Sequence, residues 1–120
     1  MSTDQDIVFH AVKKIEIIVH GDEEHFVREL LDSSGSTGYT IIRDIAGRGA
    51  HGFHEGRLLF NDEDSLVMFV AVASPDTIHR AASGLKPLFE RESGVMFVSD
   101  VQVVRLERFV RDGALYGPQN

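Results

Sequence analysis

The fold is decided by the run Leu66-Val67-Met68-Phe69-Val70-Ala71-Val72-Ala73, which leads directly into Ser74-Pro75-Asp76. The eight consecutive apolar residues predict a central strand that is covered on at least one face. Ser74 suits a helix N-cap and Pro75 suits the first helical position, so we expect a helix to begin here. Gly84 and Pro87 are expected to weaken the last turn of this helix. Its buried stripe is predicted at Ile78, Ala81, Ala82, Leu85, Leu88 and Phe89.

A second strand–helix unit precedes this one in the sequence. Along Lys13–His20, the residues Ile15, Ile17 and Val19 alternate with other side chains, which is the pattern of a strand with one apolar face. Asp22 follows and is expected to cap a helix, because an Asp side chain accepts hydrogen bonds from the first free backbone N–H groups. The apolar stripe of this helix is predicted at Phe26, Val27, Leu30 and Leu31.

Two more strands complete the pattern, one from about Tyr39 to Ala46 and a long last one from Val95 to about Phe109. The resulting order β-α-β-β-α-β is typical of the α+β ferredoxin-like sandwich, a four-stranded antiparallel sheet with both helices on one face. We expect residues 13–109 to form this domain, between a flexible N-terminal segment (1–12) and a flexible C-terminal tail (110–120). The last strand carries apolar residues on both faces, so the uncovered face of the sheet predicts an oligomer.

Composition excludes several classes of function. The chain has 120 residues, no cysteine and a formal net charge of −7. Without cysteine there is no disulfide scaffold, thiolate catalysis or Cys-ligated zinc. The acidic balance argues against binding nucleic acid. The N-terminus lacks the basic start of a secretory signal, and no apolar run approaches the roughly 20 residues that span a bilayer, so we expect a cytoplasmic protein that is not embedded in a membrane.

Four groups of residues are candidates for ligand chemistry. Gly47-Arg48-Gly49 offers backbone N–H groups and a guanidinium to an anion, or is simply a flexible hairpin. His51, His54 and Glu55 are metal-ligand types, but the glycines around them favour a solvated loop over a metal site. Arg105, Arg108 and Arg111 lie close together in the sequence, and in a strand Arg105 and Arg108 point to opposite faces. Each of these arginines is either a phosphate contact or an ordinary surface side chain in an ion pair. Ser93-Gly94 is either a turn or a backbone cradle. No catalytic motif is present, which favours a ligand sensor over an enzyme.

Several of these segments together resemble the PII-like signalling proteins. They are Lys13–Val19, Gly38-Tyr39-Thr40-Ile41-Ile42, Gly47-Arg48-Gly49, Ser74-Pro75-Asp76 and Ser93–Val101, spread over residues 13–109. Within that superfamily the chain most resembles the carboxysome-associated branch, which is similar to the bicarbonate-transporter-associated group. The resemblance implies a homotrimer whose sheets face inward, with an adenine-nucleotide site between each pair of subunits. The family's T-loop would be residues 50 to about 65, and its B-loop about residues 91–94.

The resemblance also assigns roles to individual residues. It implies that Thr40 contacts the base or ribose of the nucleotide, and that bicarbonate is held by Arg48, Gly49 and His51. The implied protein partner is a bicarbonate transporter or a carboxysome component, which is reached when ligands order the T-loop. The remaining nucleotide contacts that it implies are Gly47, Arg48, Gly49, Gly94, Arg105 and Arg108.

The B-loop departs from the family pattern in a way that bears on ligand choice. PII proteins that bind ATP carry a lysine in this loop, whereas Glu90-Arg91-Glu92-Ser93-Gly94 has none. Its two glutamates would repel a third phosphate, so we expect AMP or ADP to be preferred over ATP. No obligatory cofactor is expected.

Two other functions remain open from the sequence, besides a purely structural adaptor that binds no ligand. One is a trimeric divalent-metal-binding protein of the same fold, similar to divalent-cation-tolerance proteins, which would use His51, His54 and Glu55. The other is a small enzyme of the dimeric ferredoxin-like barrel type, which needs a ligand pocket on the face of the sheet. The number of chains in solution separates the last of these from a trimer.

Overall fold

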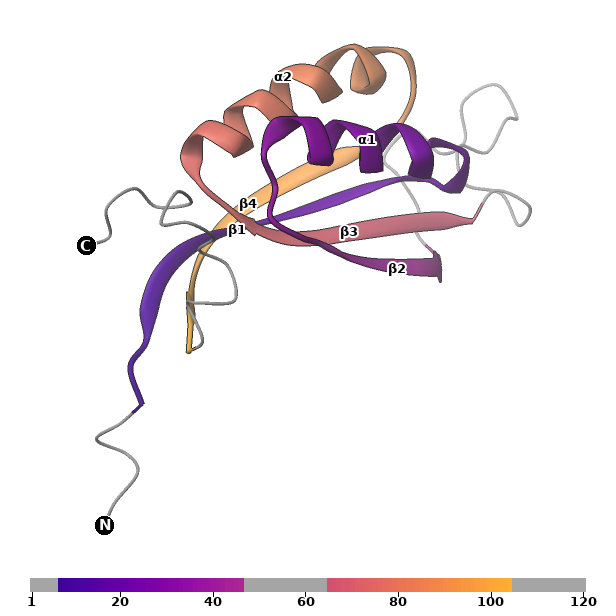
Figure 1. Ribbon diagram of the computed structural model, residues 1–120. Helices are drawn as coiled ribbons and strands as arrows, with labels where there is room; N and C mark the ends of the chain where they lie inside the picture. The colour runs from indigo at the N-terminus through magenta and orange to yellow at the C-terminus, as the bar shows by residue number, and fades with distance from the viewer. Residues whose placement is uncertain (1–6, 47–64, 105–120) are drawn as a thin grey trace.

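The computed structural model describes residues 7–46 and 65–104 (Figure 1). Strand β1 (His10–His20) leads through a short 3-10 turn, η2 (Gly21–Glu23), into helix α1 (Glu24–Ser34). Strands β2 (Thr40–Ile45) and β3 (Leu66–Ala73) follow, then helix α2 (Pro75–Arg91) and strand β4 (Val95–Val103). This order confirms the predicted βαββαβ arrangement. In the described ranges no helix is both long and apolar enough to cross a bilayer.

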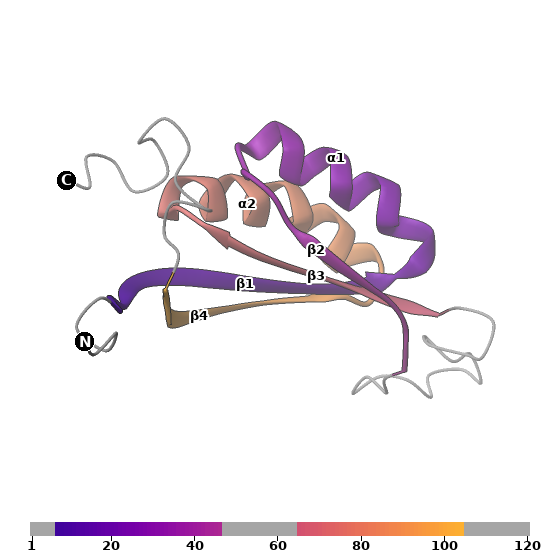
Figure 2. The ribbon, with the colours of Figure 1, turned by 60° about the horizontal axis from the view of Figure 1, so that its bottom comes forward.

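The sheet has four antiparallel strands in the order β2-β3-β1-β4. Both helices lie on the same face of it (Figures 1 and 2), which confirms the α+β ferredoxin-like fold. The ladders pair Ile17 of β1 with Phe69 of β3 on one side and with Met96 of β4 on the other. Strands β1 and β3 are therefore central, and β2 and β4 form the two edges.

The core lies between the sheet and the helices. The side chains of Ile15, Ile17 and Val19 alternate inward along β1 and are fully buried, as their spacing predicted. Burying one side chain of this size contributes about 1.5–3 kcal/mol relative to leaving it exposed. Their partners in the core cluster include Val27, Leu31, Val67, Phe69, Ala81, Leu85 and Leu88.

Helix α2 begins as predicted. The Ser74 side chain accepts a hydrogen bond from the Thr77 N–H at 3.2 Å, and Pro75 occupies the first helical position. The helix continues past Pro87 to Arg91, and the N–H of Glu92 still donates to the carbonyl of Leu88 at 2.9 Å. A proline removes only one helical hydrogen bond, and the burial of the apolar face holds the last turns in place.

Several sequence expectations need correction. Asp22 does not cap a helix: it lies inside the 3-10 turn η2, and no side chain caps α1 at Glu23. The turn is instead closed by the Gly21 N–H, which donates to the carbonyl of Ser65 at 2.7 Å. Phe26 is 43% exposed, and Ala82 is exposed as well, because each lies on the outward side of its helix.

Strand boundaries also differ from the predictions. Strand β1 begins at His10 because residues 10–12 pair with Val103, Gln102 and Val101 of β4. Three residues that were assigned to a flexible N-terminal segment are thus part of the sheet. Strand β2 is one residue shorter at each end than expected, and β4 ends at Val103. The rest of the predicted last strand, from residue 105 to 109, lies outside the described residues.

The face of the sheet opposite the helices carries large apolar side chains. Paired residues of antiparallel strands point to the same side, so Ile18, Met68 and Val95 share this face. Phe97 lies on it and is 52% exposed, and Ile42 of β2 is 39% exposed. The uncovered apolar face predicted from the sequence is therefore present in the described residues, and such a face is a candidate surface for contact with another chain.

We predict that Leu85→Ala lowers the free energy of unfolding by about 2–5 kcal/mol, because it leaves a cavity at a fully buried position. Chemical denaturation with a circular-dichroism readout measures this change. Ser83→Ala, at an exposed position on the same helix, is the control and should change stability by less than about 0.5 kcal/mol. Equal effects of the two substitutions would contradict the burial of Leu85.

Candidate functional site

A hollow of about 310 Å³ lies at the start of edge strand β2. Its volume is at the low end of the range of about 300–1,000 Å³ that is usual for ligand pockets. Threonine side chains provide hydroxyl groups, and valines of β3 provide an apolar wall. The lining residues are Thr37, Gly38, Tyr39, Thr40, Val70, Ala71 and Val72. Thr40, the predicted base or ribose contact, thus lines a hollow of suitable size.

The loop between α1 and β2 holds this hollow in place. Gly35 ends α1 with a left-handed φ of 99°, a conformation that glycine adopts without a steric cost. The Arg80 side chain donates two hydrogen bonds, of 3.0 and 2.9 Å, to the carbonyl of Ser34. Tyr39 then packs its ring edge-on against Phe69, with 5.7 Å between the ring centroids. These contacts fix the chain on both sides of Gly38 and orient Thr40.

The loop between α2 and β4 is the predicted B-loop. Gly94 packs so closely that an added Cβ would lie 2.8 Å from Cε1 of Phe89. Next to it, the hydroxyl oxygen of Ser93 is buried and makes no hydrogen bond. Leaving such a group without a partner costs about 1–3 kcal/mol. The sequence marked Ser93-Gly94 only as a turn or a cradle, so the unpaired hydroxyl is a feature that sequence reasoning missed.

Negative charge gathers at the same loop. The pKa of Glu23 is raised above its ordinary value, mainly by burial and then by repulsion from Glu92. Arg91 opposes this shift and Asp22 adds to it. Glu23 comes from the turn after β1, so its contribution to the charge of the B-loop was invisible in the sequence. Glu23 therefore adds to the repulsion that the glutamates of the B-loop are expected to exert on a third phosphate.

Thr40 and Gly94 lie at opposite edges of the sheet. The registers place Thr40 in one row with Val70, Glu16 and Phe97, and Gly94 lies three residues before Phe97. Neighbouring strands are about 4.8 Å apart, so the two edge strands are separated by roughly 14 Å. Within one chain, a nucleotide in the hollow at Thr40 is therefore far from the backbone of Gly94.

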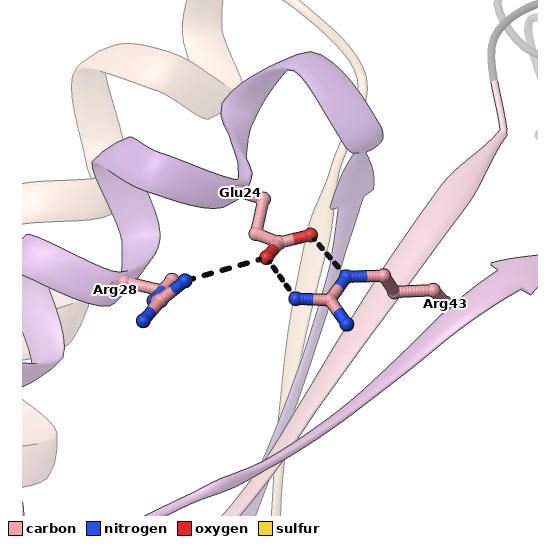
Figure 3. A network of polar contacts seen from close by, with 3 residues as sticks. All are labelled: Glu24, Arg28 and Arg43. Atoms are coloured by element: carbon pink, nitrogen blue, oxygen red, sulfur yellow. Dashed lines mark hydrogen bonds and ion pairs between the residues drawn. The ribbon is translucent and has the colours of Figure 1, made fainter.

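A polar network joins α1 to β2 (Figure 3). The guanidinium of Arg43 donates to both carboxylate oxygens of Glu24, at 2.8 and 2.6 Å, and Arg28 lies 3.7 Å from the same carboxylate. The hydrogen bond from Arg43 is the main cause that lowers the pKa of Glu24, and the same bond raises the pKa of Arg43. No local pattern in the sequence points to this pair, because its members are 19 residues apart.

Most of the predicted site residues lie outside the described ranges. These are Gly47, Arg48, Gly49, His51, His54, Glu55, Arg105 and Arg108. Of the predicted nucleotide contacts, the structure describes Thr40 and Gly94, and it places them apart. No cluster of three or more metal-ligating side chains occurs within residues 7–46 and 65–104.

The family model for the nitrogen regulatory protein P-II matches residues 12–108. The chain belongs to the P-II family. The members of this family are regulators rather than enzymes. The resemblance inferred from the sequence is thereby confirmed, and so is the fold that it implied. A comparison with curated proteins finds no match.

Solved structures of one PII-like relative are similar over most of this chain. This relative is CPII, a nitrogen regulatory PII-like protein from Thiomonas intermedia K12. Its structure with ADP, AMP and bicarbonate is 42% identical, with a TM-score of 0.72, over 86% of this chain and 97% of CPII. The structure with ADP, AMP and acetate is 38% identical, with a TM-score of 0.73, and covers 98% of CPII. The structure with ADP and bicarbonate is 40% identical, with a TM-score of 0.71, over 86% of this chain and 98% of CPII.

We predict that Gly94→Ala destabilises this P-II family member by about 1–3 kcal/mol, because the added methyl group collides with the ring of Phe89. Gly38→Ala is the matched control, since an added Cβ there meets no atom within 4 Å. Urea denaturation of the two variants measures the difference. Equal midpoints for both would show that the B-loop is not packed as described.

We predict that Glu23→Gln raises the thermal midpoint by about 2 °C at pH 7 and has less effect at pH 4. A carboxyl group whose pKa is raised by folding binds its proton more tightly in the folded state. Its charge therefore opposes folding above the ordinary pKa of 4.5, and this penalty disappears as the pH falls below that value. Thermal denaturation at the two pH values measures the effect, and an identical change at both would contradict it.

Proposed function

We propose that this chain is a PII-like regulatory protein that senses adenine nucleotides together with bicarbonate and has no catalytic activity of its own. The observation that carries this proposal is the structure of CPII bound to ADP, AMP and bicarbonate, at 42% identity. ADP and AMP are preferred over ATP, because the B-loop brings glutamates where a lysine would be needed for a third phosphate. No cofactor other than these ligands is required.

The hollow beside Thr40 receives the adenosine part of the nucleotide. Its combination of threonine hydroxyls and an apolar wall suits a planar base joined to a hydroxylated sugar. Gly94 offers its backbone to the phosphates, and the unpaired hydroxyl of Ser93 gains a partner when a phosphate or a neighbouring chain approaches. The remaining contacts that we assign to the nucleotide are Gly47, Arg48, Gly49, Arg105 and Arg108. Bicarbonate is assigned to Arg48, Gly49 and His51.

Each site combines two chains of a homotrimer. Thr40 and Gly94 lie at opposite edges of one sheet, so a single nucleotide contacts both only where the β2 edge of one chain meets the B-loop of another. The apolar face with Phe97, Ile42 and Val95 supplies the surface that the trimer buries. Both observations support an oligomer, and the family resemblance supports three chains.

Binding of nucleotide and bicarbonate changes the conformation of the T-loop, residues 50 to about 65, and so alters the surface presented to a partner. Regulation of inorganic-carbon metabolism in the cytoplasm fits a bicarbonate ligand, with a bicarbonate transporter or a carboxysome component as the partner. The residues of the alternative metal site, His51, His54 and Glu55, lie outside the described ranges.

Titration calorimetry with ADP, AMP and ATP, each with and without bicarbonate, tests the proposal. We expect ATP to bind about tenfold more weakly than ADP, and bicarbonate to strengthen ADP binding. Thr40→Val should weaken ADP binding by about tenfold, which corresponds to the loss of one hydrogen bond at about 1.4 kcal/mol. Equal affinities for the three nucleotides, with no effect of bicarbonate, would overturn the proposal.

The same samples carry their own controls. Ser83→Ala removes an exposed hydroxyl from α2 that does not line the hollow at Thr40, and it should leave ADP binding unchanged. Light scattering should give the mass of three chains, and calorimetry should give one nucleotide for each chain. A mass of two chains would favour the dimeric barrel enzyme instead.

A further inference from the structure

The two hydrogen bonds from Arg43 to Glu24 form the contact from which we argue (Figure 3). Both are short, and they engage the two oxygens of one carboxylate in the parallel geometry that is specific to arginine. The Glu24 side chain is only 19% exposed, whereas that of Arg43 is 58% exposed. Arg28, one turn further along α1, lies on the other side of the same carboxylate. Glu24 is therefore held from both sides and offers Arg43 a fixed partner.

Arg43 lies at a point where strand β2 has few other contacts that hold it in the sheet. Strand β2 is an edge strand, so only β3 holds it through backbone hydrogen bonds. The ladder between them is interrupted directly after Arg43, where Asp44 adopts a left-handed φ of 59°. Pairing resumes with Ile45 opposite Leu66. The ion pair thus fastens β2 to the helix layer at the point where its ladder is weakest.

The same strand carries a residue of the proposed site at its other end. Thr40 begins β2 and lines the hollow, and the chain beyond Ala46 leads to Gly47, a proposed nucleotide contact. A rotation or shift of β2 would therefore displace both the base contact and the start of the segment after the strand. A side chain that fixes β2 against α1 acts on the ligand without touching it.

We propose that Glu24 and Arg43 are a positioning pair for the nucleotide site, which fixes the end of β2 against α1 and thereby raises the affinity for ADP. This inference rests on the proposed function, because it names ADP as the ligand. The family resemblance did not point to this pair, because neither Glu24 nor Arg43 belongs to the segments that carry it.

The magnitude follows from the type of interaction. Ion pairs near the surface contribute little to stability, so each single substitution should change the stability of the fold only slightly. The same energy limits the effect on the ligand, and we expect Glu24→Gln and Arg43→Gln each to weaken ADP binding by about three- to fivefold. Arg43→Lys keeps the charge but not the double hydrogen bond, so its loss of affinity should be smaller.

A double-mutant cycle read by calorimetry with ADP tests the pair. Glu24→Gln combined with Arg43→Gln should bind ADP as weakly as either single variant, because both remove the same interaction. Glu29→Gln is the matched control: it removes an exposed carboxylate from the same helix, which lies 3.0 Å from His25, and should bind ADP like the unaltered protein. Unchanged affinity in both single variants, or losses that add in the double variant, would overturn the inference.

Hydrogen exchange of the ligand-free protein gives a second readout that does not depend on the ligand. Amides of Asp44–Ala46 should exchange faster in Glu24→Gln and Arg43→Gln, while those of β3 stay unchanged. If the unaltered protein binds no nucleotide, the proposed function fails, and the exchange rates then test only whether the pair fixes the end of β2 against α1. Unchanged exchange at Asp44–Ala46 would overturn it, and faster exchange would support it.

Discussion

The structure depends on the pairing of β1 with β3 in the middle of the sheet. Ile17 and Phe69 face each other across this ladder, and both are fully buried beneath the helices. Every second residue along each strand points to the same face, so the apolar side chains of β1 and β3 form one continuous layer beneath the helices. The helices can settle only on the face where this layer lies. The opposite face remains free for contacts with other chains.

Because β1 and β3 occupy the centre of the sheet, the candidate ligand contacts lie at its two edges. Strand β2 and the B-loop before β4 each depend on a single neighbouring strand, and each carries a candidate ligand contact. Their positions are set by contacts from outside the ladder: Arg43 with Glu24 on one edge, and Gly94 against Phe89 on the other. A ligand that joins the two edges of different chains would therefore sense the packing of both. The location of the proposed site follows from the topology of the sheet, not from any one motif.

Charge is also distributed differently at the two edges of the sheet. The net charge of −7 made a polyanionic ligand improbable from the start. In the folded chain, Glu24 is neutralised by two arginines, whereas Glu23, its immediate neighbour, faces Glu92. Two adjacent acids thus have opposite pKa shifts because they point to different edges of the sheet. One stabilises a strand, and the other makes the B-loop unfavourable for additional negative charge.

The sequence by itself determined the elements and their order. Alternation along β1, the apolar run of β3 and the start of α2 at Ser74-Pro75 are local patterns that depend on residues at most four positions apart. It also carried the family resemblance, and with it the expectation that Thr40 contacts the nucleotide. Only the tertiary structure decided that Asp22 lies in a 3-10 turn, that β1 begins at His10, and that Arg43 meets Glu24. These features are contacts between segments distant in the chain, and the free energy that selects them comes from pairing and burial, which no local pattern of residues contains.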